Sequence, residues 1–144
     1  MYIPGEWHFC DDGTERPVIR GEILALTSTW EKTLFLVDTG ADRTVLSADA
    51  LAALGVPTLP PDQRLGGLGG VVDAVPVGTT IRLPDGQTGK VTFRGQFAAV
   101  ADPDMLDMSV LGRDITGLFA VIVDRPGDVV CLVGQRHRYA IHTV

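Results

Sequence analysis

The chain has 144 residues, of which 45% are hydrophobic and 21% are charged, and its formal net charge at pH 7 is −6. The length suits a single domain with one hydrophobic core, and the composition is that of a globular protein, not of a disordered one. The acidic balance argues against a nucleic-acid partner, because phosphate binding favours a basic surface. It also suits a cytoplasmic protein, and we expect this location.

Residues 1–16 are polar and irregular in pattern, and we predict an N-terminal arm there, ahead of a domain that spans residues 17–134. The start of the chain has neither the basic region nor the apolar region of a signal peptide, so we expect no export signal. Residues 135–144 are predicted to form a C-terminal tail.

Two predicted strands lead to the first residue of chemical interest. Residues 18–27 are rich in apolar side chains, and residues 33–37 form a short apolar run of the kind found in buried strands. Asp38 follows this run directly, before Thr39 and Gly40. An ionised carboxylate is costly to bury without a partner, so its position raises the question of where that partner lies. Taken alone, Asp-Thr-Gly is also compatible with an Asx turn that closes a strand.

The strongest helix signal follows at residues 47–55. Ser47 can cap the helix N-terminus, Asp49 suits its positive end and Gly55 suits its stop. Helix is otherwise scarce, and the other candidate is a short helix from Arg113 to about residue 118.

Residues 65–70, Leu-Gly-Gly-Leu-Gly-Gly, contain four glycines. Glycine loses much conformational entropy in regular structure, so no rigid element is expected there. The flanking residues 62–64 and 71–77 can both form strands. These features predict a hairpin with a mobile, thin tip that carries Leu68, and such a tip can close over a bound chain. The stretch lacks the pattern of a dinucleotide fingerprint or a phosphate loop, and a flexible linker is the alternative.

The second half of the chain predicts further strands. Alternating apolar and polar residues predict a strand at residues 91–101, after a turn marked by Pro-Asp-Gly at residues 84–86. Residues 119–124 and 128–133 flank Arg-Pro-Gly and predict another hairpin. The longest apolar run, residues 118–123, is too short to span a membrane, so we expect no membrane partner.

Residues 109–114, Ser-Val-Leu-Gly-Arg-Asp, bring apolar residues up to a glycine and an arginine. By itself this pattern is an ordinary strand end followed by a helix start. Together the elements predict a compact, mostly antiparallel β domain with one or two short helices. Closed or sandwich-like packing is the natural way to bury so many short apolar strands.

Three of these stretches, in this order, resemble the retropepsin family of aspartic proteases. Residues 36–42 (Leu-Val-Asp-Thr-Gly-Ala-Asp) match the family's catalytic loop, residues 65–70 its glycine-rich flap, and residues 110–114 the apolar-apolar-Gly-Arg segment before its helix. Residues 120–133 look more like the bacterial and cellular members than the compact viral ones. The resemblance covers roughly residues 17–133 and implies a single-domain, retropepsin-like acid protease barrel that forms a C2 homodimer.

The resemblance also implies a role for each matching residue. Asp38 would be the catalytic carboxylate, Thr39 would brace the loop through its hydroxyl, and Gly40 would allow a tight turn that presents its carbonyl to the substrate. Asp42 and Arg113 would form a structural pair at the edge of the cleft. The residues implied in substrate binding are Gly40, Asp42, Leu65, Gly66, Gly67, Leu68, Val72 and Val110.

The chain holds one Asp-Thr-Gly, and its nearest imitation, residues 114–117, has the wrong spacing. A second copy must supply the partner, and two facing carboxylates can then share one proton. The implied function is an aspartic endopeptidase, in which Asp38 and its symmetry copy activate a water to cleave a peptide or protein bound in extended conformation. Residues 135–144 could add a dimer-edge strand. The alternatives are a non-catalytic dimeric peptide-binding module on the same fold and a hydrolase of a non-peptide substrate.

No residue pattern indicates a metal or a cofactor, and we expect neither. His8, His137 and His142 lack metal-binding spacing. Cys10 and Cys131 lie far apart in the chain, and we expect two reduced thiols in a protein without an export signal.

Overall fold

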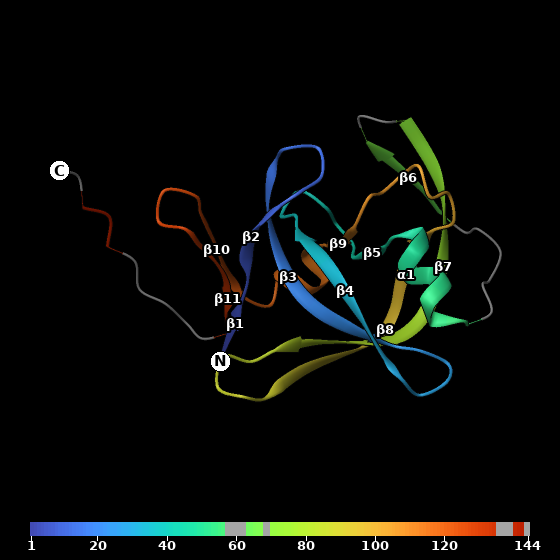
Figure 1. Ribbon diagram of the computed structural model, residues 1–144, viewed down its shortest axis with the longest axis horizontal. Coiled ribbons are helices and arrows are strands. Elements are labelled where there is room, and N and C mark those ends of the chain that lie inside the picture. Colours follow the sequence, from blue (N-terminus) through green and yellow to red (C-terminus); the bar gives the residue numbers. More distant parts are fainter. Residues whose placement is uncertain (57–62, 68–69, 135–139, 143–144) are drawn as a thin grey trace.

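The computed structural model describes residues 1–56, 63–67, 70–134 and 140–142, which form a mostly β fold with two short helices (Figure 1). The strands are β1 (Tyr2–Pro4), β2 (Glu6–Phe9), β3 (Glu15–Leu24), β4 (Trp30–Val37), β5 (Val45–Leu46), β6 (Gln63–Gly67), β7 (Gly70–Pro84), β8 (Lys90–Val100), β9 (Ser109–Leu111), β10 (Ala120–Asp124) and β11 (Val129–Val133). The helices are α1 (Ala48–Leu54) and α2 (Arg113–Thr116).

The strands form two sheets. The larger sheet has the order β2-β3-β4-β9-β5-β8-β7-β6, and the smaller has the order β1-β11-β10. The pairs β4–β9 and β5–β8 are parallel. Strand β3 also pairs with β7, with Glu22 opposite Arg82 and Ile23 opposite Ile81. This pairing joins two strands that stand far apart in the order, so backbone pairing runs in a closed circuit from β3 through β4, β9, β5 and β8 to β7.

Side chains reinforce this closure. Nε of Arg82 donates a hydrogen bond of 2.8 Å to Glu22, and its guanidinium lies 3.9 Å from the ring centroid of Trp30. Lys90 donates to the other Glu22 oxygen at 3.1 Å. Burial raises the pKa of the Glu22 carboxyl, but the hydrogen bonds from Arg82 and Lys90 outweigh burial and hold that pKa below its usual 4.5. An ionised Glu22 therefore connects β3, β7 and β8 at one corner of the sheet.

The hydrophobic core contains side chains from both sheets and from both helices. Its fully buried members are large aliphatic and aromatic residues, among them Ile3, Ile19, Ile23, Phe35, Leu46, Leu54, Ile81, Leu83, Leu111 and Leu132. Helix α1 packs Ala50 and Leu54 against this core. It begins and ends as the sequence predicts: the Ser47 side chain accepts a hydrogen bond from the Ala50 amide, and Gly55 adopts φ +63° at the C-terminus.

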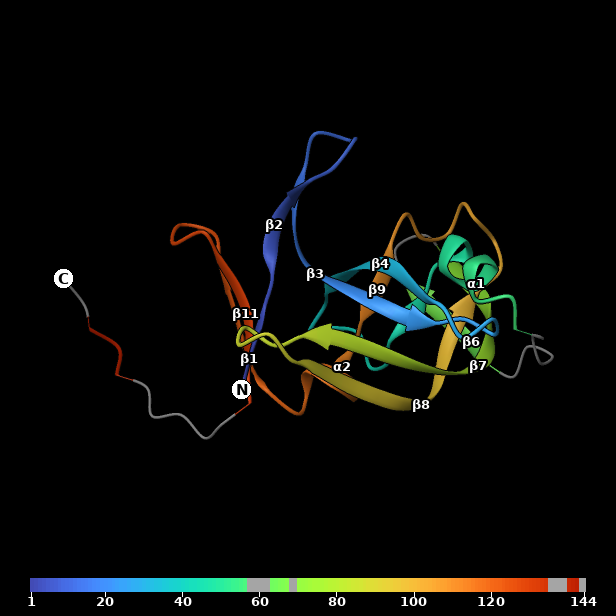
Figure 2. The same cartoon turned by 60° about the horizontal axis from the view of Figure 1, so that its bottom comes forward.

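The first nine residues differ from the irregular segment expected from the sequence. They form β1 and β2. Both strands are paired with a later part of the chain: β1 pairs with β11, and β2 pairs with β3. Ile3 is fully buried opposite Leu132. Figure 2 shows that the β2–β3 hairpin and the β10–β11 hairpin project from the same end of the molecule. Met1, Tyr2, Ile3, Trp7 and Phe9 are hydrophobic, so the prediction of a polar, irregular segment was wrong for these nine residues, and long-range pairing completes the two strands.

The other predicted elements correspond to structural elements. Residues 18–27 and 33–37 fall largely in β3 and β4, and residues 91–101 fall almost entirely in β8. The hairpins expected around residues 84–86 and 125–127 are β7–β8 and β10–β11. Helix α2 ends at Thr116, two residues earlier than expected. No helix in the described ranges is long and apolar enough to cross a membrane.

Candidate active site

Asp38 lies at the end of β4, where this strand runs parallel to β9. Leu36 and Val37 of β4 pair with Val110 and Leu111 of β9, and the Asp38 amide donates to the Leu111 carbonyl at 3.2 Å. This last bond anchors the start of the segment from Asp38 to Thr44, which we call the Asp38 loop. Residues 36–42 and 110–114, which the sequence singled out separately, are therefore neighbours in space.

The Asp38 loop turns back at Gly40. The Gly40 amide donates to Oδ1 of Asp38 at 2.9 Å, and the Ala41 amide donates to the Asp38 carbonyl at 3.2 Å. The Asx turn that the sequence allows is therefore present. It uses only one carboxylate oxygen, because Oδ2 of Asp38 has no hydrogen-bond partner among the residues that the structure describes. Asp38 is half-buried, whereas Thr39 and Gly40 are exposed.

Arg113, the first residue of α2, bonds to three residues of the Asp38 loop. Its amide donates to the Ala41 carbonyl at 2.8 Å, and its guanidinium donates to the Thr39 carbonyl at 2.9 Å and forms an ion pair with Asp42. The side chains of Arg113 and Asp42 are 52% and 82% exposed, so the ion pair alone contributes little free energy. The additional bond to Thr39 is what connects α2 to the residue next to Asp38.

The junction between β9 and α2 needs a glycine, Gly112, because the backbone of the Asp38 loop passes close to it. A Cβ atom at this position would overlap the backbone of Arg43, so no other residue fits without moving the Asp38 loop. Two further residues join the loop to α2: Thr44 is fully buried and contacts the carboxylate of Asp114. The sequence did not single out Thr44, and it gave Asp114 only as the last residue of the 110–114 match and as a poor imitation of Asp38. Their pairing depends on contacts 70 positions apart, for which the local pattern gives no signal.

The residues predicted to bind a substrate lie on three elements besides the loop. Val110 is buried on β9, between β4 and β5. Leu65, Gly66 and Gly67 lie on β6, which forms a hairpin with β7 in which Leu65 is opposite Val72 and Gly67 is opposite Gly70. The hairpin predicted from the glycine-rich stretch therefore exists, while Leu68 lies outside the described residues.

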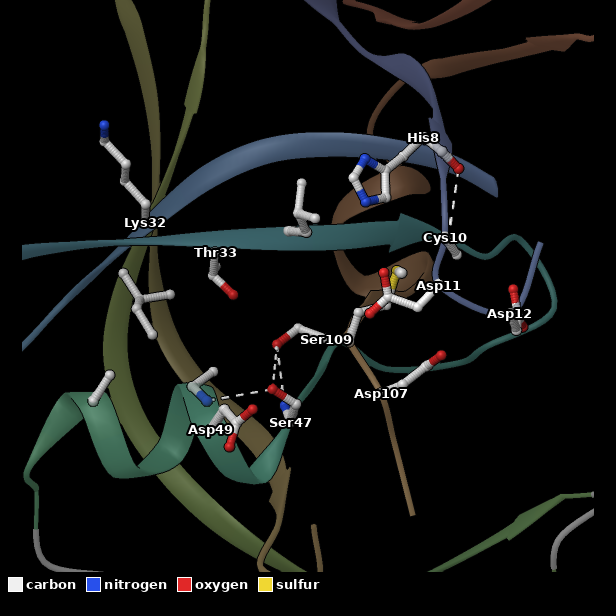
Figure 3. Close-up of a pocket in the computed structure, with 15 residues that line it drawn as sticks. His8, Cys10, Asp11, Asp12, Lys32, Thr33, Ser47, Asp49, Asp107 and Ser109 are labelled. Carbon is white, nitrogen blue, oxygen red and sulfur yellow. Dashed lines mark hydrogen bonds between the residues drawn. The ribbon is translucent and has the colours of Figure 1, made fainter. Parts of the chain in front are cut away.

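A separate cavity of about 510 Å³ lies between the β2–β3 hairpin, β4, α1 and the segment before β9 (Figure 3). Among the residues whose side chains the structure describes, none of the predicted site residues lines it. It is lined by His8, Cys10, Asp11, Asp12, Ile23, Lys32, Thr33, Leu34, Ser47, Asp49, Ala50, Ala53, Asp107, Met108 and Ser109. Across the described parts of the chain, no group of three or more His, Cys, Asp or Glu residues is arranged to hold a metal ion. Cys10 and Cys131 are both buried and free.

Comparison with known proteins places this geometry among proteases. The family model described as "Aspartyl protease" matches residues 30–115, which include β4, the Asp38 loop, β9 and the start of α2. A retropepsin-like aspartic protease from Rickettsia conorii matches with a TM-score of 0.60 and 21% identity, over 92% of this chain and 88% of that chain. EIAV protease, solved in complex with the inhibitor HBY-793, matches with a TM-score of 0.51 and 23% identity, over 71% of this chain and 86% of that chain. A search of curated proteins finds no significant match. The two solved structures share the fold of this chain.

Proposed function

This chain belongs to the aspartyl protease family, and on that premise we propose that it is a homodimeric aspartic endopeptidase of the retropepsin type. One observation carries the proposal: the half-buried Asp38 carboxylate is fixed through Oδ1 by the Gly40 amide, while Oδ2 has no partner among the described residues. A carboxylate that one hydrogen bond holds in place, and whose second oxygen is left without a partner, is suited to act on a substrate or to face a second carboxylate.

A second copy of the chain would supply the partner of Asp38. A two-fold axis beside the exposed Thr39 and Gly40 would bring Asp38 to face its own copy, and C2 dimers are the commonest symmetric assembly. Two carboxylates at about 3 Å cannot both be ionised, so the pair would share one proton. The ionised member would then accept a proton from a water, and the protonated member would donate one to the substrate carbonyl as the water attacks it.

The substrate would be a peptide or protein in extended conformation. The β6–β7 hairpin would serve as a flap over it, with Leu68 at the tip and Leu65, Gly66, Gly67 and Val72 on its two strands. On the opposite side, Val110 would line an apolar pocket, and the Gly40 carbonyl and Asp42 would contact the substrate backbone. We place the reaction in the cytoplasm and assign it no cofactor.

The proposal is tested by incubating the purified protein with a denatured protein substrate over a range from acid to alkaline pH. We expect cleavage at internal peptide bonds, inhibition by a transition-state mimic of aspartic proteases, and a bell-shaped pH profile whose limbs belong to the carboxylate pair. A protein that binds extended peptides but cleaves none would instead be the peptide-binding module. Cleavage with a flat pH profile would contradict a coupled pair of carboxylates.

Replacement of Arg113 should damage the site more than replacement of Asp42. Arg113→Ala removes the hydrogen bond to the Thr39 carbonyl together with the ion pair, whereas Asp42→Ala keeps that bond and removes the exposed ion pair and the proposed substrate contact of Asp42. We expect kcat to fall by about tenfold for Arg113→Ala, equal to about 1.4 kcal/mol. For Asp42→Ala we expect kcat to fall by less than about fivefold, the upper end for an exposed ion pair, and the lost substrate contact to raise KM.

The double variant should have the kcat of Arg113→Ala alone, because one partner's loss already breaks the pair. Arg20→Ala is a matched control, since Arg20 is 61% exposed and pairs with Glu6 outside the Asp38 loop. Additive losses from Asp42→Ala and Arg113→Ala would show that their ion pair does not contribute to activity.

A further inference from the structure

The buried Thr44 and the exposed Asp114 join the far end of the Asp38 loop to α2. The Thr44 amide donates to both carboxylate oxygens of Asp114, at 3.0 and 2.9 Å, and the Thr44 hydroxyl donates to Oδ1 at 2.7 Å. The Ile115 amide donates to the same Oδ1 at 2.9 Å. Thr44 has no solvent exposure whereas Asp114 is exposed, so these bonds are partly shielded from water, and it is the Thr44 end that is costly to leave unpaired.

The Thr44 hydroxyl also accepts a hydrogen bond of 3.1 Å from the Gly112 amide. A hydroxyl has one hydrogen to donate, and Asp114 takes it, so a lone pair is left to face Gly112. Asp114 therefore fixes the direction of the Thr44 hydroxyl. Without this carboxylate, the hydroxyl could rotate and lose the Gly112 amide.

The Gly112 amide and the Leu111 carbonyl belong to one planar peptide group. Its carbonyl accepts from the Asp38 amide at 3.2 Å, and its amide donates to Thr44 at 3.1 Å. The two ends of the Asp38 loop are thus bonded to opposite sides of one rigid plane. A rotation of this plane would move both ends, including the backbone of Asp38.

From this arrangement we infer that Thr44 and Asp114 are positioning residues, which set the Asp38 carboxylate through the Leu111–Gly112 peptide group. Neither residue touches a reacting atom. The predicted effect on turnover rests on the proposed protease function, whereas the predicted effect on the geometry of Asp38 does not. A misplacement of about 1 Å by a change away from the chemistry can lower a rate by about 100-fold.

The test compares Thr44→Val, which keeps the shape but removes the hydroxyl, with Thr44→Ser, which keeps the hydroxyl. Thr116→Val is the matched control, because Thr116 is equally inaccessible on α2 and its side chain makes no hydrogen bond to another described residue. We expect Thr44→Val to lower kcat by about 10- to 100-fold with KM nearly unchanged. We expect Thr44→Ser to restore most of kcat, and Thr116→Val to leave it at the wild-type value.

A second measurement reports the position of Asp38 without any substrate. The Gly40 amide proton is bonded to Oδ1 of Asp38, so its NMR resonance should move upfield in Thr44→Val and stay in place in Thr44→Ser and Thr116→Val. Should Thr44→Val not fold, Asp114→Ala takes its place, since alanine offers no side-chain acceptor to the Thr44 hydroxyl or amide. An unchanged Gly40 resonance and an unchanged kcat in the folded variant would overturn the inference. A wild-type protein without protease activity would refute the proposed function, and the Gly40 resonance would still decide the positioning role.

Discussion

Asp38→Asn should abolish peptide hydrolysis, with a loss of at least about three orders of magnitude in kcat. An asparagine amide can neither accept a proton from the attacking water nor share one with a facing carboxylate. The local structure should survive, because the asparagine oxygen can still accept the Gly40 amide that now bonds to Oδ1 of Asp38. Cleavage of a denatured protein and thermal unfolding, measured on one preparation, separate these two effects.

The chain offers a close control for this substitution. Asp102 forms the same kind of Asx turn as Asp38, since its Oδ1 accepts from the Asp104 amide at 2.9 Å, but it lies outside the Asp38 loop. Asp102→Asn should keep full activity. We expect Asp38→Asn to unfold at the wild-type temperature or above it, because active-site groups are often retained at a cost in stability. Activity that survives in a clean Asp38→Asn preparation would rule out Asp38 as a member of the reacting pair.

The second large effect should appear when chains are mixed. If each active site needs Asp38 from two copies, an excess of Asp38→Asn chains should capture wild-type chains in inactive mixed dimers. With nine variant chains for each wild-type chain and free exchange, wild-type activity should fall by about tenfold. For the same reason, activity of the wild type alone should fall more steeply than linearly on dilution once the dimer dissociates.

Asp102→Asn chains provide the control for mixing, because they retain Asp38 and should raise total activity when added in the same excess. Analytical ultracentrifugation over the same concentrations would show whether activity follows the fraction of dimer. A constant specific activity on dilution, with no effect of Asp38→Asn chains, would mean that the partner of Asp38 is not supplied by a second copy. The retropepsin fold could then stand, but the shared-proton mechanism could not.

Local sequence patterns were sufficient to identify the family and most of the strands. The prediction of a retropepsin-like aspartic protease is confirmed by the family model over residues 30–115 and by the two solved structures that share the fold. The predicted mostly β class with one or two short helices is confirmed as well, since the described residues form α1 and α2. These features are encoded within a few residues of each other: an apolar run before Asp38, a cap at Ser47, a stop at Gly55. The dimer and the roles of the site residues stay predictions.

Only the tertiary structure decided which distant residues support the Asp38 loop. Thr44 and Asp114 are ordinary polar residues in the sequence, and they form a hydrogen-bonded pair because parallel pairing of β4 with β9 brings residues 70 positions apart together. Strands β1 and β2 likewise exist because β11 and β3 offer backbone partners to two short segments of three and four residues. The physical reason is the same in both cases. Periodicity and turn residues act over short stretches of chain, whereas a buried hydrogen bond or an added strand depends on where the rest of the fold places its partner.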